Sequence, residues 1–224
     1  MLPEPVIHDG GWVCVSAPVG GERVDMLRRQ SRIPAPAKLV PGLMLKAEMP
    51  AGADLAVSIA AVRDSLALAT AILARAPGMA LEIGPRMLDA EAVALRLRDS
   101  SVEFVAEGDA FLAQKEGIRL TAKITDAVIF QTDLVRFQQS EDAALRALAH
   151  FSLALNARLR FARASLLDDR LVLEVALPPA ALTPDVIQKA VGSLQVGVEV
   201  ARRECAALSD PRMAARYLEF HKEI

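Results

Sequence analysis

The feature that constrains the fold most is an internal repeat at a separation of 128 residues. The segment GLMLKAEMP at 42–50 aligns without a gap with RLVLEVALP at 170–178. Apolar and charged residues alternate in the first copy, which predicts a half-buried strand with Lys46, like Glu174 in the second copy, pointing outward. The alignment continues into the following helical segments, with identities at Leu43 and Leu171, Leu45 and Leu173, Pro50 and Pro178, Ile59 and Ile187, Ser65 and Ser193, Leu66 and Leu194, Arg75 and Arg203.

A second, shorter match follows each copy, because the tripeptide PRM at 85–87 recurs at 211–213. Segments rich in Ala, Leu and Val can match by chance, but the ungapped register and the common order of elements favour a true repeat. A strand–helix–helix unit has one apolar face, and two copies can bury these faces around a pseudo-twofold axis. We therefore predict an α+β fold in which antiparallel sheets pack against long helices and two related strand–helix–helix halves, 1–99 and 100–224, form a pseudo-dimer.

The remaining pattern predicts an unequal pair of halves. Residues 33–41 contain too many prolines for a helix. The strands predicted within 102–137 and the helix predicted over 141–156 have no clear counterpart in the first half, which lacks an evident leading helix. The expected elements are strands at 12–16, 42–49, 102–106, 117–123, 127–137, 158–164 and 170–177, and helices at 54–76, 85–98, 140–156, 183–207 and 210–222.

Composition limits the class of protein. Hydrophobic residues make up 53% of the chain and aromatic residues only 4%, so Ala, Leu and Val must build the core. The formal net charge of −2 argues against a general nucleic-acid binder, although a local basic patch is compatible with it. The most apolar stretch, 57–76, is interrupted by Arg63, Asp64 and Arg75, which predicts a core helix and no membrane partner.

The cysteines and the N-terminal residues predict a cytoplasmic location. Cys14 and Cys205 are far apart, and neither belongs to a C-x-x-C pair, so we expect two buried apolar thiols without a disulfide or a zinc site. The first residues lack the basic start and the apolar run of a secretory signal.

Motifs for catalysis or for cofactors are missing from the sequence. It contains no P-loop, no G-x-G-x-x-G turn and no G-x-S-x-G elbow. Its three histidines, His8, His150 and His221, have no metal-ligand spacing, and the pair His8-Asp9 lies in an N-terminal segment. We therefore predict no enzyme and no catalytic, cofactor-binding or metal-ligating residue.

Charged pairs and runs are expected to be structural. Asp168-Asp169 suits a hairpin turn, and Glu141-Asp142 suits the first turn of a helix. The basic run formed by Arg28, Arg29, Arg32 and Lys38 predicts a solvated edge, with an acidic partner or a phosphate as the alternative.

The second half resembles a known family. The segment 141–205 has the order helix, strand, strand, long helix, with a turn that closes in Leu177-Pro178 and a helix start at Leu182-Thr183. In these features it resembles the type III secretion chaperone-like fold, which includes YbjN-like proteins. The resemblance covers 101–207 and, less closely, 11–76. It implies a non-enzymatic binding module, often a dimer, that wraps segments of a partner.

Three functions remain open at this point. The first is a non-catalytic protein-binding module, chaperone-like or adaptor, that binds partner segments through apolar grooves or exposed strand edges. It would be a monomeric pseudo-dimer or a homodimer. The second is a small-ligand sensor with a pocket between the halves. The third is an unrecognised hydrolase or transferase, which requires His8, His150 or His221 to cluster with acids.

Overall fold

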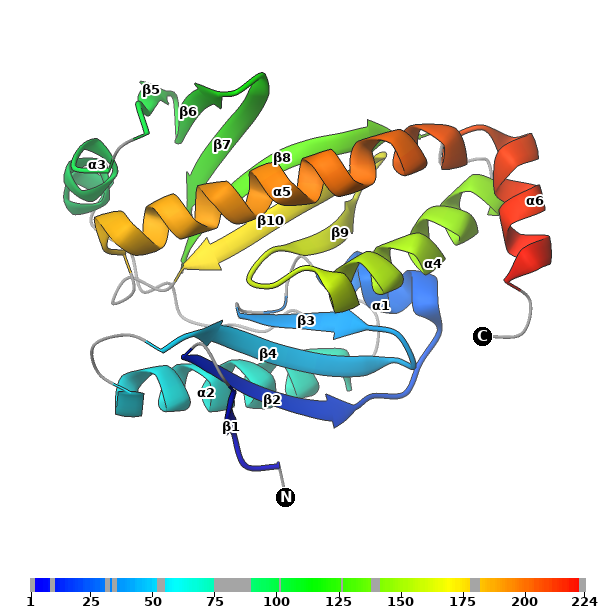
Figure 1. The fold of residues 1–224 in the computed structure, drawn as a ribbon, viewed down its shortest axis with the longest axis horizontal. Helices are drawn as coiled ribbons and strands as arrows, with labels where there is room; N and C mark the ends of the chain where they lie inside the picture. Colours follow the sequence, from blue (N-terminus) through cyan, green and yellow to red (C-terminus); the bar gives the residue numbers. More distant parts are fainter. Residues whose placement is uncertain are drawn as a thin grey trace.

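The polypeptide folds into two antiparallel sheets that lie edge to edge, with helices packed on both (Figure 1). The computed structural model describes residues 3–8, 11–30, 33, 36–51, 55–74, 90–100, 102–125, 127–137, 142–177 and 182–221. The predicted α+β class with antiparallel sheets is confirmed.

The first sheet has four strands in the order β1-β2-β4-β3. Its elements along the chain are β1 (Val6–His8), β2 (Trp12–Pro18), α1 (Arg23–Gln30), β3 (Ala37–Val40), β4 (Met44–Pro50) and α2 (Leu55–Leu73). Helix α2 packs on β4 and β2 through Ser58, Val62, Ser65, Leu66, Ala69 and Leu73. By length and composition alone this helix is long and apolar enough to cross a membrane. The core helix of a soluble protein can have the same length and composition.

The second sheet has six strands in the order β5-β6-β7-β8-β10-β9. Its elements are α3 (Ala90–Arg98), β5 (Val105–Glu107), β6 (Ala110–Lys115), β7 (Ile118–Ile124), β8 (Val128–Arg136), α4 (Asp142–Arg158), β9 (Arg163–Leu167), β10 (Arg170–Leu177), α5 (Pro184–Leu208) and α6 (Pro211–Phe220). Helix α5 lies across β8 and β10 (Figure 1). Helix α3 precedes the expected boundary at residue 99 but packs on α5, so this boundary stays a prediction.

The two halves share more than the strand and helix aligned in the sequence. The order β2, α1, β3, β4, α2, α3 is repeated by β8, α4, β9, β10, α5, α6. The strands also pair in the same order, β2-β4-β3 in one sheet and β8-β10-β9 in the other. The expectation that the first half lacks a leading helix is therefore wrong, since α1 takes the place of α4. Its eight residues include three arginines, too polar a segment for an apolar period to show.

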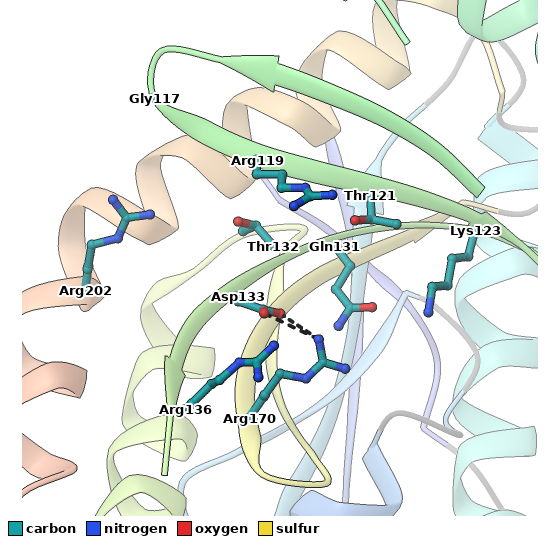
Figure 2. A pocket seen from close by; sticks show the side chains of 10 residues that line it. All are labelled: Gly117, Arg119, Thr121, Lys123, Gln131, Thr132, Asp133, Arg136, Arg170 and Arg202. Atoms are coloured by element: carbon teal, nitrogen blue, oxygen red, sulfur yellow. Dashed lines mark hydrogen bonds and ion pairs between the residues drawn. The ribbon is translucent and has the colours of Figure 1, made fainter. Parts of the chain in front are cut away.

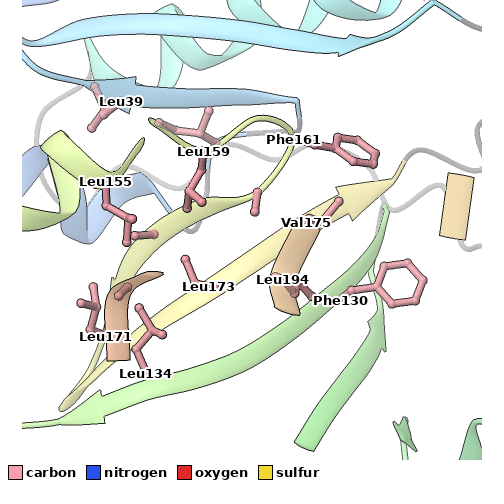
Figure 3. Packing of buried hydrophobic residues seen from close by; sticks show 14 of the residues in the cluster. Leu39, Phe130, Leu134, Leu155, Leu159, Phe161, Leu171, Leu173, Val175 and Leu194 are labelled. Atoms are coloured by element: carbon pink, nitrogen blue, oxygen red, sulfur yellow. The ribbon is translucent and has the colours of Figure 1, made fainter. Parts of the chain in front are cut away.

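The halves pack on each other reciprocally. Helix α4 of the second half packs on β3 of the first, and α1 packs on β9, while α1 and α4 also contact each other. Reciprocal contact of equivalent elements is the property of a twofold interface. The resulting core is continuous and includes Leu39 from β3, Leu173 from β10 and Leu194 from α5 (Figure 3).

Several predicted boundaries change in the structure. Helix α4 continues to Arg158, and the strand expected at 158–164 starts only at Arg163. Strands β3 and β6 were not predicted, because β3 lies in the proline-rich stretch and β6 has little alternation. The caps of the last two helices agree with prediction, since the side chains of Thr183 and Asp210 accept bonds from the first turns of α5 and α6. The segment 75–89, which contains the first PRM, lies outside the described residues.

Candidate binding groove between the two halves

A surface groove of about 470 Å³ lies where β2 of the first half meets the second half. We call it the junction groove. Trp12 comes from β2, and the other residues come from the end of α4, the segment that follows it, and α5. Its lining is mainly apolar and consists of Trp12, Arg158, Leu159, Arg160, Phe161, Lys189, Gly192, Ser193 and Val196.

The segment between α4 and β9 is held in a tight turn against α5. The Ser193 hydroxyl donates to the Arg160 carbonyl oxygen at 2.6 Å and accepts from the Ala162 N–H at 3.2 Å. Phe161 lies between these two residues with φ at 68°, in the left-handed region that side chains rarely adopt. Such strain persists only where the surrounding contacts impose it, and it is concentrated at functional sites.

Trp12 connects the two halves at the floor of the groove. Its ring meets Phe161 edge to face, with the ring centroids 6.4 Å apart. The Arg160 guanidinium carbon lies 5.6 Å from the Trp12 ring centroid, within the range of a cation–π contact. The only tryptophan of the chain therefore joins the first half to the strained turn of the second.

The groove is open to solvent over α5. The Val196 side chain is 55% exposed. A Cβ atom built at Gly192 would meet no heavy atom within 4 Å. Arg158 and Arg160 are exposed at the rim, whereas Lys189 is paired with Asp185 at 2.7 Å. The site therefore combines an apolar floor with a cationic rim.

Beside the groove, the interface between the halves buries two cations. Lys38 is 1% exposed and Arg163 is 3% exposed. The Arg163 guanidinium donates to the carbonyl oxygen of Ala37 at 2.8 Å, and the Lys38 ammonium lies 3.4 Å from the carbonyl oxygen of Ala162. Each cation thus reaches the residue that precedes the other one. Lys38 also donates to Leu159, a residue of the groove.

Two carboxylates compensate these cations. Arg163 Nε donates to Glu174 Oε1 at 2.8 Å, and this oxygen also accepts from the Ser165 hydroxyl at 2.7 Å. Glu48 Oε1 lies 2.7 Å from Lys38 Nζ, and Glu48 Oε2 lies 2.6 Å from Lys46 Nζ. The ammonium of Lys38 also donates to the carbonyl oxygen of Leu159, so it links Glu48 of the first half to the second half.

Burial and charge act in opposite directions on this pair. Burial lowers the pKa of Lys38, and the neighbouring Glu48 opposes this only in part. Burial would raise the pKa of Glu48, but Lys38 and Lys46 together lower it below its ordinary value.

These positions correct two predictions. Lys38 was expected on a solvated edge and is instead buried between the halves, because β3 is covered by α4. Glu174 and Lys46 were expected to point outward; Glu174 is buried, and the side chain of Lys46 is only 28% exposed. Of the same basic run, Arg29 donates to the Leu73 carbonyl oxygen at 3.4 Å, and Arg32 lies outside the described residues.

Two of the three histidines come together where α6 packs on the middle of α4. His150 Nδ1 lies 2.9 Å from the Tyr217 hydroxyl, and the His150 and His221 ring centroids are 5.2 Å apart. Burial, and then Glu204, raise the pKa of Tyr217. His8 belongs to β1, in the other half. Within the described ranges, no group of three His, Cys, Asp or Glu side chains could hold a metal ion.

The remaining candidates have structural positions. Asp168, with φ at 52°, forms the turn between β9 and β10 together with Asp169, as predicted. Asp142 lies in the first turn of α4, and Glu141 lies outside the described residues. Both cysteines are free, and burial raises the pKa of Cys205 to about 12, so this thiol is unreactive at neutral pH.

Sequence reasoning missed the groove itself. The sequence pattern places Trp12 only in a strand, and it predicts a strand over 158–164, which in fact includes the turn at Phe161. One signal was available: Gly192 interrupts an otherwise good helix, where glycine costs about 1 kcal/mol relative to alanine. Comparison with known proteins finds no family model that matches the chain and no curated protein with significant sequence similarity.

Proposed function

We propose that the protein is a non-catalytic binding module, of chaperone-like or adaptor kind, that holds an extended segment of a partner protein in the junction groove. The segment would carry apolar side chains flanked by acidic ones. The observation that supports this most is the open apolar floor between Trp12 and Val196, with Arg158 and Arg160 at its rim. A cationic rim around an apolar floor complements such a segment.

Two further observations support a chain as the ligand. The space above Gly192 is open, so a segment can enter and leave the groove along α5. The resemblance of 101–207 to the type III secretion chaperone-like fold also favours a module that binds partner segments.

Strand edges are a weaker place for binding. By strand order, β1 and β5 are outer edges, and each has only three residues. The other two edges, β3 and β9, are covered by α4 and α1. Short edges offer few backbone hydrogen bonds, so we assign the main affinity to the groove.

A peptide library displayed on phage and selected on the full chain tests the proposal. We expect enriched peptides with aromatic or aliphatic residues next to Asp or Glu. For a selected peptide, Val196→Asp should weaken binding at least about tenfold, because it places a negative charge on the floor. Val105→Asp is the matched control, since Val105 is also exposed, at 69%, but lies on β5; it should change the affinity less than about twofold.

Two results would overturn the proposal. One is a set of selected peptides without this composition. The other is an equal loss of binding in Val196→Asp and Val105→Asp. Native mass spectrometry separates the sensor alternative: a stoichiometric small molecule that is bound by the wild type and lost in Val196→Asp would support a ligand sensor instead.

A further inference from the structure

A second site lies in the six-stranded sheet, where β7 separates from β8. These strands pair only between Thr121–Ile124 and Val128–Gln131. Before Thr121, β7 is paired only with β6, back to Ile118. After Gln131, β8 is paired only with β10, up to Arg136. The two strands therefore diverge and leave an opening between them (Figure 2). We call this opening, of about 420 Å³, the basic pocket.

Cations dominate the lining of the basic pocket. It contains five basic side chains and a single carboxylate, that of Asp133; the basic residues are Arg119, Lys123, Arg136, Arg170 and Arg202. Arg170 Nη1 lies 3.3 Å from both oxygens of Asp133. The lining thus carries a net charge of +4, in a chain whose formal net charge is −2.

The other four cations lack acidic partners in the described part of the chain. Arg119, Lys123, Arg136 and Arg202 have no carboxylate within 4.0 Å there, although the chain contains 28 acidic residues. They come from three separate elements: β7 supplies Arg119 and Lys123, β8 supplies Arg136, and α5 supplies Arg202 (Figure 2). Like charges repel each other at such a site, and an anion would relieve the repulsion.

Polar groups that suit oxygen atoms complete the pocket. Thr121, Gln131 and Thr132 line it between the cations. The facing edges of β7 and β8 have no strand partner beyond Thr121 and Gln131, so their backbone N–H groups add donors. Guanidinium groups bind phosphate oxygens through paired hydrogen bonds. The arginines of the pocket offer more donors than the two oxygens of a single carboxylate ligand can accept.

We propose that the basic pocket binds a small ligand with two or more phosphoryl groups. Its volume suits a di- or triphosphate and is too small for a nucleic-acid strand to pass through. The negative net charge of the whole chain also opposes a long polyanion. This site is independent of the junction groove, although α5 contributes to both.

Isothermal titration of the full chain with inorganic tripolyphosphate, pyrophosphate and orthophosphate tests the proposal. We expect a Kd of about 10–100 μM for tripolyphosphate, and binding that weakens in the order given. The double substitution Arg136→Gln and Arg202→Gln should weaken tripolyphosphate binding at least about thirtyfold. Arg146→Gln removes an equally positive group on the exposed face of α4 and should change binding less than about twofold.

Four results would overturn the proposal. They are no binding at about 1 mM ligand, an equal loss in the control variant, competition by sulfate as strong as that by tripolyphosphate, and tighter binding of single-stranded DNA than of tripolyphosphate. The last result would assign the pocket to nucleic acid. Circular dichroism of each variant checks that the fold is retained.

Discussion

The two halves of the molecule place a buried cation at the same point of the same strand pair. Lys38 on β3 lies opposite Lys46 on β4, and Arg163 on β9 lies opposite Glu174 on β10. Positions 46 and 174 are aligned by the sequence repeat, so Lys38 and Arg163 are equivalent. Each one contacts the backbone of the other half.

The difference lies in how each cation is neutralised. Arg163 has its carboxylate directly opposite, and no second cation is within ion-pair distance of Glu174 in the described chain. Lys38 faces another lysine, and its carboxylate, Glu48, is displaced along β4 and shared with Lys46. The two halves therefore share the contact between a buried cation and the other half, and they differ in how the charge of that cation is compensated. The second half depends on one ion pair, while the first has a spare cation.

Arg163→Met should have the largest effect. It leaves Glu174 buried with only the Ser165 hydroxyl, and removal of one partner of a buried ion pair costs about 3–5 kcal/mol. It also leaves the carbonyl oxygens of Ile33 and Ala37 without this donor. Urea unfolding, followed by Trp12 fluorescence and by circular dichroism, measures the loss. A loss below about 1 kcal/mol would contradict the assigned role.

Lys38→Met should cost less, about 1–3 kcal/mol, because Lys46 still neutralises Glu48 and the burial of a charged ammonium is avoided. The same unfolding experiment compares the two variants directly. If Lys38→Met proves as destabilising as Arg163→Met, Lys46 does not neutralise Glu48 in the absence of Lys38. The two halves would then not differ in the way described.

Two glycines of α5 lie in different surroundings: Gly197 faces the packed core of the second half, and Gly192 faces the open groove. A Cβ at Gly197 would lie 2.6 Å from Leu173 Cδ1, so Gly197→Ala should destabilise by about 1–2 kcal/mol through overpacking. Gly192→Ala meets open space and should stabilise by about 0.5–1 kcal/mol. Thermal unfolding gives both signs. Destabilisation by Gly192→Ala would mean that the groove is not open.

The smallest expected effect is the acid dependence carried by the first half. The pKa of Glu48 in the folded chain is below its ordinary value of 4.5, so its charge stabilises the fold above about pH 4.5. This contribution is lost as the pH falls through the lowered pKa. The difference in unfolding free energy between wild type and Glu48→Gln should therefore shrink from pH 6 towards pH 3 (about one and a half pH units on either side of 4.5). A constant difference would contradict it.

Some parts of the fold were predictable because their residues alternate regularly or because a characteristic residue pair marks the start of a helix. The α+β class, the strand at 170–177 and the caps of the last two helices follow from alternation, apolar stripes and Thr-Pro or Asp-Pro pairs. Helix α1 and strand β3 were not predictable from the sequence because they are short and are stabilised by contacts with the other half. Local patterns carry no record of such contacts.

Neither site was predictable in this way. The basic pocket collects cations from β7, β8, β10 and α5, which are widely separated along the chain. The junction groove depends on the turn at Phe161 and on Trp12, 149 positions earlier. The burial of Lys38 was not predictable either. A lysine in a basic run indicates a surface position, and the sequence does not show that Glu48 pairs with it in the interior.

Hydrogen exchange of the full chain, with and without a selected peptide, tests most directly where the partner segment binds. If the partner segment lies at the junction of the halves, the peptide should slow exchange at the start of β2, at 158–162 and along the part of α5 that contains Gly192 and Val196. Slowed exchange confined to β1 or β5, or spread evenly over one half alone, would contradict the account.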